Sequence, residues 1–159
     1  MILQTYKRPK SIAHGKDGCI FQIAKGLVAK IGYGEAKTQH DAKIAERLYA
    51  EGISVPVPYG VNPVTFPAKT IQDAFSGRTI NGFVMDKVIG KTGFQLRGLG
   101  LEIIDEAYNL LNREISRAIR KGFTPSDFKY PGNFIFTPEH EIKLLDFTWW
   151  SHRDIPLFS

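Results

Sequence analysis

Four polar residues of the chain stand where a reactive site would need them: Lys30, Asp127, Asn133 and Asp146. A lysine ammonium group attracts anions such as phosphate, and an Asp–Asn pair offers the hard oxygen ligands that Mg²⁺ prefers. A further carboxylate can accept the proton of a hydroxyl group. Taken singly, each residue also has an ordinary explanation, as a charge at a strand end or a residue of a turn. The choice between a reactive site and these ordinary explanations must therefore rest on the order of the four residues and on their flanking sequence.

The first third of the sequence alternates short β-rich runs with glycines: SIAHG, CIFQIA and GLVAKIG. This pattern predicts three short antiparallel strands with turns at residues 15–18 and 25–26. Residues 35–50 place Asp41, Ala45 and Leu48 on one stripe and are followed by Gly52, which predicts a helix with a glycine stop. Beyond the helix we expect an extended edge segment at prolines 56 and 58, an irregular connection over residues 62–79, and a strand within 80–90.

The second half begins with apolar residues at helical spacing between residues 99 and 119, which predicts one long amphipathic helix that Gly122 ends. A polar, turn-rich loop follows, and then the strands NFIFT and IKLLDF around the turn PEHE. We therefore expect an α+β chain. Its first half is rich in strands and has one helix, and its second half is helical and carries a β-hairpin with polar residues at its base.

Two segments of the sequence contain these polar residues in a characteristic order. GKDGCIFQIAKGLVAKIG is a glycine hairpin followed by Val-Ala-Lys30, and DFKYPGNFIFTPEHEIKLLDF places Asp, Asn and a second Asp around a hairpin. Here the sequence resembles the protein-kinase-like superfamily, especially its small atypical members: the RIO kinases, the archaeal-type small kinases and the aminoglycoside phosphotransferases. The resemblance spans about residues 10–148 and implies a two-lobed fold. Residues 1–86 would form an antiparallel β-sheet N-lobe with one helix, and residues 87–159 a severely truncated helical C-lobe.

The resemblance implies an ATP site in the first lobe. Gly15 and Gly18 would let backbone N–H groups approach the phosphates, and Lys30 would bring a cation to them. A carboxylate on the helix must orient this lysine. Asp41 on the inward stripe is the first candidate for this role, Glu46 the second and Glu35 the third. The adenine would meet the connection between the lobes, at Met85, Asp86 and Val88.

The resemblance also implies a metal site and a catalytic carboxylate. Asn133 and Asp146 would bind Mg²⁺, and Asp127 would lie near the acceptor hydroxyl group as base or positioner. The Asn-to-Asp spacing of 13 residues (146 − 133) fits the family hairpin. The spacing from Asp127 to Asn133 is six residues (133 − 127) where the signature has five, so one residue has been inserted or Asp127 is not the base.

Two further departures from the family pattern bear on activity. Pro125-Ser126 stands where the signature has His-Arg, and Thr148 replaces the glycine of D-F-G. An active minimal Ser/Thr protein kinase acting on a protein substrate is the first hypothesis. The second is a nucleotide-binding pseudokinase that serves as a docking or regulatory module. The third is a small-molecule kinase of the aminoglycoside phosphotransferase type.

Only 13 residues (159 − 146) follow Asp146 in this sequence, so we expect it to lack the helices that usually hold a peptide substrate. We expect the target protein, or a partner that completes the truncated C-lobe, to supply that surface. The adjacent Trp149 and Trp150 would either cover the base of the small lobe or bind such a partner.

Composition narrows the classes of partner and of cellular location that the protein could have. The sequence has 21 Lys and Arg and 16 Asp and Glu, which gives a net charge of +5. Because the basic residues form no long block, nucleic acid is not expected as a partner. The single Cys19 can form no intramolecular disulfide. No apolar run approaches the ~20 residues of a membrane span. We expect a cytoplasmic protein without a membrane partner, acting in a host cell if its source is a virus, a phage or a bacterium that secretes effectors.

Overall fold

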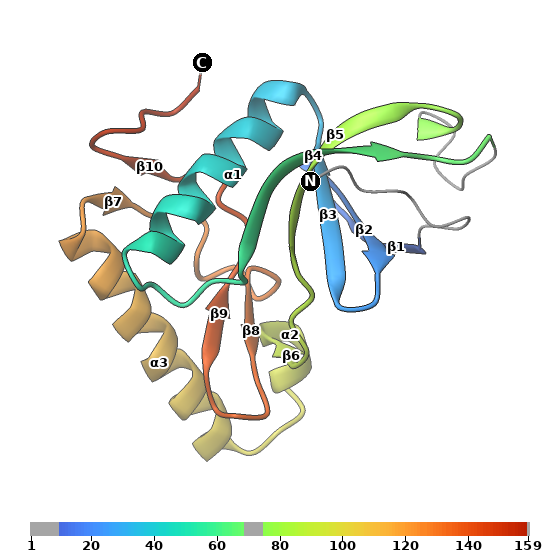
Figure 1. The fold of residues 1–159 in the computed structure, drawn as a ribbon. Coiled ribbons are helices and arrows are strands. Elements are labelled where there is room, and N and C mark those ends of the chain that lie inside the picture. Colours follow the sequence, from blue (N-terminus) through green and yellow to red (C-terminus); the bar gives the residue numbers. More distant parts are fainter. Residues whose placement is uncertain (1–9, 69–74, 159) are drawn as a thin grey trace. The chain divides into compact units, whose positions relative to one another are not determined.

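The computed structural model describes residues 10–68 and 75–158 (Figure 1). Its elements, in chain order, are β1 (Lys10–His14), β2 (Gly18–Ala24), β3 (Leu27–Gly32), α1 (Glu35–Ala50), β4 (Pro58–Thr65), β5 (Thr79–Asp86), β6 (Lys91–Thr92), α2 (Gly93–Leu96), α3 (Leu101–Arg120), β7 (Phe123–Thr124), β8 (Phe134–Phe136), β9 (Ile142–Leu144) and β10 (Ser151–His152). Within the described residues, 10–43, 57–68, 75–87 and 158 form one compact unit, and 44–56 and 88–157 form a second. Helix α1 contributes its first half to the first unit and its second half to the other.

The first unit is built on an antiparallel sheet with the strand order β1-β2-β3-β5-β4 (Figure 1). The expected three-strand meander forms its first part, with turns where the glycines predicted them. Side chains alternate in burial along β2, as a half-buried strand requires. One face of the sheet carries an apolar core made of Cys19, Phe21, Ile23, Ala29, Ile31, Val64, Phe66 and Val84.

One sequence expectation for this unit was wrong. Residues 62–65, expected to be irregular, continue β4, which pairs with β5 from Pro58 to Thr65. Strand β4 lies at the edge of the sheet, where Pro63 is tolerated because an edge strand can leave one N–H position unpaired. The middle of the expected irregular connection, residues 69–74, lies outside the described residues.

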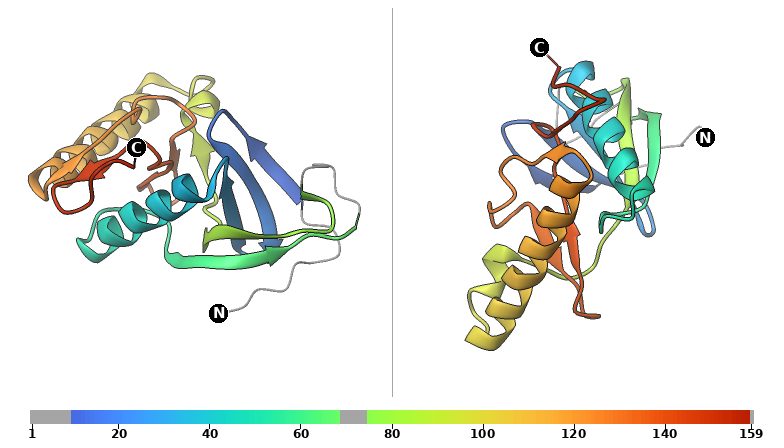
Figure 2. Two further views of the ribbon diagram at one scale, coloured as in Figure 1. Left: turned by 90° about the horizontal axis from the view of Figure 1, so that it is seen from above. Right: turned by 90° about the vertical axis from the view of Figure 1, so that its left-hand side faces the viewer.

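The second unit packs α3 against β9 and β7. The buried residues of α3 are Ala107, Leu111, Ile115 and Ala118, which are spaced to form one stripe along the helix. Gly122 adopts a φ of 93° directly after the helix, the left-handed conformation that ends helices and favours glycine. Figure 2 shows α3 running beside the β8–β9 hairpin, whose buried Phe134 and Leu144 complete this core.

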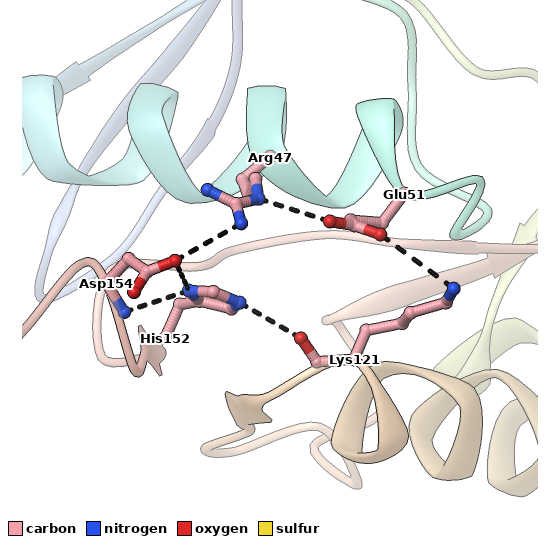
Figure 3. A network of polar contacts seen from close by, with 5 residues as sticks. All are labelled: Arg47, Glu51, Lys121, His152 and Asp154. Atoms are coloured by element: carbon pink, nitrogen blue, oxygen red, sulfur yellow. Dashed lines mark hydrogen bonds and ion pairs between the residues drawn. The ribbon is translucent and has the colours of Figure 1, made fainter.

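A polar network joins the last residues of the second unit to the ends of its two longer helices (Figure 3). Arg47 contacts Glu51 and Asp154, each at 3.3 Å, and Lys121 approaches Glu51 at 3.9 Å. His152, only 4% exposed, forms a hydrogen bond between its Nε2 and the carbonyl oxygen of Lys121 at 3.0 Å. The segment after β9 is thereby fixed to the body of this unit. None of the helices in the described part of the chain has the length and apolar character that crossing a membrane requires.

Candidate functional site

Lys30 lies in β3 of the first unit with its side chain turned away from the apolar core. Its neighbours Ala29 and Ile31 belong to that core, and because successive side chains of a strand alternate, Lys30 points to the other face. There its ammonium group forms an ion pair with Asp41 of α1. The two residues are only 8% and 3% exposed. Burying two charges costs stability unless they pair closely, so this ion pair is a specific feature of the fold.

The structure distinguishes among the three helix carboxylates considered from the sequence. Asp41 is the one that pairs with Lys30, as its place on the inward stripe suggested. Glu46 is exposed on another face of α1. Glu35, also exposed, accepts a hydrogen bond from Asn81 at 3.2 Å. The sequence ranking therefore agrees with the contact, although the contact alone assigns no catalytic role.

The glycine turn between β1 and β2 is closed by a hydrogen bond from the Gly15 N–H to the Gly18 carbonyl, at 3.0 Å. The two glycines differ in their surroundings. A Cβ on Gly18 would lie 2.4 Å from the carbonyl oxygen of Ile31, so close packing of β2 and β3 by itself requires glycine there. A Cβ on Gly15 would meet no described atom within 4 Å. Of the two, Gly15 is therefore the glycine whose surroundings leave open space.

The residues expected to meet adenine lie at the end of β5 and just after it. Met85 is half-buried in the strand. The Asp86 N–H donates to the Val57 carbonyl at 3.0 Å, and its carboxylate accepts from the Tyr59 hydroxyl at 2.7 Å. These contacts occupy the Asp86 amide, so the N–H group of Val88 is the donor that the adenine hypothesis has to rely on.

Two successive turns bring Asn133 back to Asp127 in the second unit. The Tyr130 N–H donates to the Asp127 carbonyl at 3.2 Å, and the Asn133 N–H donates to the Tyr130 carbonyl at 2.9 Å. The Asn133 side chain then closes the loop by donating from Nδ2 to the Asp127 carbonyl at 2.9 Å. The six-residue spacing, one longer than in the signature, is thus accommodated as two steps of three residues.

The β8–β9 hairpin brings Asn133 next to the residue before Asp146. The Leu145 N–H donates to the Asn133 carbonyl at 2.9 Å, directly beyond the pairing of Phe134 with Leu144. The Asp146 carboxylate accepts a hydrogen bond from the Thr148 hydroxyl at 2.9 Å. Thr148, two residues after Asp146, therefore holds the carboxylate in place.

Asp127 and Asp146 both adopt the left-handed backbone conformation, with φ values of 55° and 60°. Non-glycine residues adopt this region rarely, and strained residues of this kind concentrate at functional sites. In the described residues, only His140 shares it among non-glycine positions, and it lies in the turn between β8 and β9. Strain therefore coincides with two of the three acidic and amide residues that the sequence singled out here.

The sequence did not predict the contact that fixes the loop containing Asp127. Trp150, only 1% exposed, donates from its indole N–H to the carbonyl oxygen of Ser126 at 2.9 Å, one residue before Asp127. Its neighbour Trp149 is 39% exposed. The pair of tryptophans predicted a covered apolar area, but a contact across 24 residues leaves no signal in local spacing. Trp150 thus positions the loop, whereas Trp149 remains accessible.

The donor atoms suit a hard divalent cation. Because Asn133 donates through its amide nitrogen, its Oδ1 is the atom that it can offer a metal, alongside the oxygens of Asp146. Mg²⁺ usually takes one or two protein oxygens and completes its shell with water and phosphate. The described residues contain no cluster of three or more His, Cys, Asp or Glu side chains placed to hold a metal. Asn133 and Asp146 would thus supply two oxygen-bearing side chains if a cation bound here.

Comparisons by sequence give no assignment: no family model matches the chain, and no curated protein matches it. Solved structures do match it. A Stt7 homolog from Micromonas algae, soaked with ATP, aligns with a TM-score of 0.67 over 91% of this chain and 49% of its own, at 15% identity. WbdD aligns at 0.57 over 86% of this chain and 31% of its own, at 14% identity. WbdD crystallised with the kinase inhibitor LY294002 also aligns at 0.57, over 90% and 33%, at 18% identity.

These similarities confirm the expected α+β, protein-kinase-like fold. The chain spans about half the length of the Stt7 homolog and about a third of WbdD. At such identities the likeness establishes the fold alone. The particular resemblance to RIO kinases, and the roles of the site residues, stay predictions.

Proposed function

We propose that the chain is an ATP- and Mg²⁺-dependent phosphotransferase, and that it is a minimal Ser/Thr protein kinase. The observation that carries this proposal is the loop and hairpin that gather Asp127, Asn133 and Asp146, two of them in strained conformations. The buried Lys30–Asp41 pair of the first unit supports it, because burying two charges is costly and therefore calls for a specific role. The kinase-like fold makes phosphoryl transfer the reaction to test first.

In this proposal each residue has a role that its chemistry allows. Lys30, aimed by Asp41, binds phosphate oxygens of ATP, while the backbone at Gly15 leaves room for them. Asn133 and Asp146 would hold Mg²⁺, which would offset the negative charge of the phosphates. The acceptor hydroxyl oxygen bonds to the γ-phosphorus as the bond to ADP breaks, and Asp127 accepts the hydroxyl proton. The short path from Asp127 to Asn133 through two turns supports Asp127 as this base.

The acceptor is proposed to be a serine or threonine of a protein. A partner protein, or the target itself, would complete the surface that holds the acceptor, and the exposed Trp149 is a candidate contact for it. Capture of such a partner would depend on Trp149 and not on the buried Trp150.

The test is transfer of the labelled γ-phosphate of ATP in the presence of Mg²⁺, by the chain alone and with cell lysate. Lys30→Ala, Asp127→Ala and Asp146→Ala are each expected to reduce labelling at least about a hundredfold. Lys43→Ala and Asp105→Ala are matched controls, because they remove the same charges from exposed helix positions. Equal labelling by the wild-type chain and Asp146→Ala would contradict the proposal.

A nucleotide-binding pseudokinase is the second candidate. Pro125-Ser126 favours it, because these residues stand where the kinase signature has His-Arg directly before the catalytic carboxylate. This alternative predicts that ATP with Mg²⁺ raises the melting temperature while no label is transferred to any protein of the lysate.

A further inference from the structure

Asp17 places a carboxylate in the turn that the proposed function assigns to phosphate binding. The residue lies between Gly15 and Gly18 and is only 8% exposed. A carboxylate so close to a triphosphate would repel it, and a buried charge without a counterion is costly. Electrostatics alone would favour a neutral residue at this position, so its burial calls for a structural reason.

The contacts of Asp17 supply that reason. Its carboxylate accepts a hydrogen bond from the ammonium group of Lys37 at 3.2 Å, with the two side chains 9% and 24% exposed. Its carbonyl oxygen accepts from the Tyr33 N–H at 3.0 Å. The Asp17 side chain is thus tied to the first turns of α1, while its backbone is tied to the chain just after β3.

The start of α1 is itself held tightly against the end of β3. The Gly32 N–H donates to the Thr38 hydroxyl at 2.9 Å, and Thr38 is 3% exposed. A Cβ on Gly32 would lie 3.0 Å from the Cβ of Lys37. Lys37 therefore projects from a fixed part of the helix and can act as an anchor for the turn.

Lys37 and Asp41 are four residues apart and lie on the same side of α1. The first pairs with Asp17 of the glycine turn and the second with Lys30 of β3. The two ion pairs therefore have opposite polarity along one helix face. Sliding the helix by one turn would bring Lys37 toward Lys30, so the pattern specifies a single register of α1 on the sheet.

We propose that Asp17 and Lys37 are positioning residues that lock the glycine turn to α1, in the same register in which Asp41 aims Lys30. The inference rests on the proposed function, because it assigns the turn to nucleotide phosphates. A turn that is already ordered loses less entropy when a nucleotide binds. The pair should therefore control the affinity for nucleotide and the KM for ATP, with little effect on kcat.

The experiment measures amide hydrogen exchange of residues 15–19 in the nucleotide-free chain, and binding of a fluorescent ATP analogue with Mg²⁺. Lys37→Met is expected to speed exchange in the turn and to weaken binding about tenfold, the scale of a lost charged hydrogen bond. Lys37→Arg should retain both properties, and the double exchange Asp17→Lys with Lys37→Asp should restore slow exchange. Lys43→Met, which removes the same charge from an exposed position of α1, is the control.

The outcomes separate this inference from the proposed function. Unchanged exchange in Lys37→Met, or unchanged affinity, overturns the inference, as does a double exchange that fails to slow the turn. Wild-type chain that binds no nucleotide overturns the proposed function, while the exchange data still decide whether the pair orders the turn. Should Lys37→Met fail to fold, Asp17→Asn provides the same comparison with a smaller change of shape.

Discussion

The imidazole of His152 donates a hydrogen bond from Nε2 to the backbone carbonyl of Lys121, at 3.0 Å. Its Nδ1 accepts from the Asp154 N–H, also at 3.0 Å. Because a carbonyl can only accept and an N–H can only donate, the two partners together specify the neutral ring with its proton on Nε2. His152 also packs against Phe123, with ring centroids 4.6 Å apart. It is thus a structural histidine of the second unit.

His152→Ala should lower the free energy of unfolding by about 2–4 kcal/mol, because it removes a buried ring and leaves the Lys121 carbonyl without this donor. Denaturation by urea, followed by circular dichroism, measures the change. His140→Ala is the matched control: His140 forms a surface contact with Glu106 at 2.8 Å, and its loss should cost less than about 1 kcal/mol. Equal losses for the two variants would refute a special role for His152.

Thr148→Val should raise the Mg²⁺ concentration needed for nucleotide binding by roughly tenfold or more, because the loss of a group that orients a metal ligand commonly weakens metal binding to that extent. The change removes the hydroxyl that holds the Asp146 carboxylate at 2.9 Å and preserves the shape of the side chain. Titration of nucleotide binding with Mg²⁺ measures it, below the melting temperature of the variant. Thr148→Ser keeps the hydroxyl and should behave as wild type. A valine variant with wild-type Mg²⁺ dependence would show that the contact is incidental.

Gly18→Ala and Gly15→Ala should separate stability from binding in the glycine turn. The alanine at position 18 would collide with the Ile31 carbonyl and should cost about 1–3 kcal/mol of stability. At position 15 the stability should stay within about 0.5 kcal/mol of wild type. If the turn binds phosphate, Gly15→Ala should nevertheless weaken binding of ATP, which thermal melts with and without nucleotide would reveal. Loss of stability in both variants would contradict the difference in packing.

Cys19→Ala should lower the pKa of Tyr33. The hydrogen bond to the Cys19 sulfur, at 3.4 Å, raises the pKa of the Tyr33 hydroxyl above its usual value, with smaller contributions from desolvation and from the electrostatic interaction with Cys19. A raised pKa in the folded state stabilises the chain below about pH 10, and this contribution is lost as the pH rises through the pKa of Tyr33. Titration of tyrosinate absorbance in wild type and variant tests the shift. Superimposable curves would rule out the contact in solution.

Local patterns were sufficient for much of the fold. Glycine punctuation and β-rich runs located β1, β2 and β3, and helical spacing located α1 and α3, because each signal depends on residues close in the chain. The inward stripe of α1 also ranked Asp41 ahead of Glu46 and Glu35, and Asp41 is the carboxylate among these three that contacts Lys30.

Contacts between distant residues were beyond such patterns. The bonds of Trp150 to Ser126 and of Lys37 to Asp17 join residues 24 and 20 positions apart, and either partner alone has an ordinary surface or core explanation. The short strands β6, β7 and β10 have two residues each and exist only because a partner strand lies beside them. Their sequences carry too few residues for a period to be read.

The two three-residue turns between Asp127 and Asn133 have a consequence for how related chains are searched for. A pattern that fixes the number of positions between the carboxylate and the amide rejects this chain, although the side chain of Asn133 still reaches the Asp127 carbonyl. A pattern written as a hydrogen-bonded path, in which the amide must return to that carbonyl, accepts this chain. A search for loops of this kind should therefore specify closure of the ring and leave the residue count open.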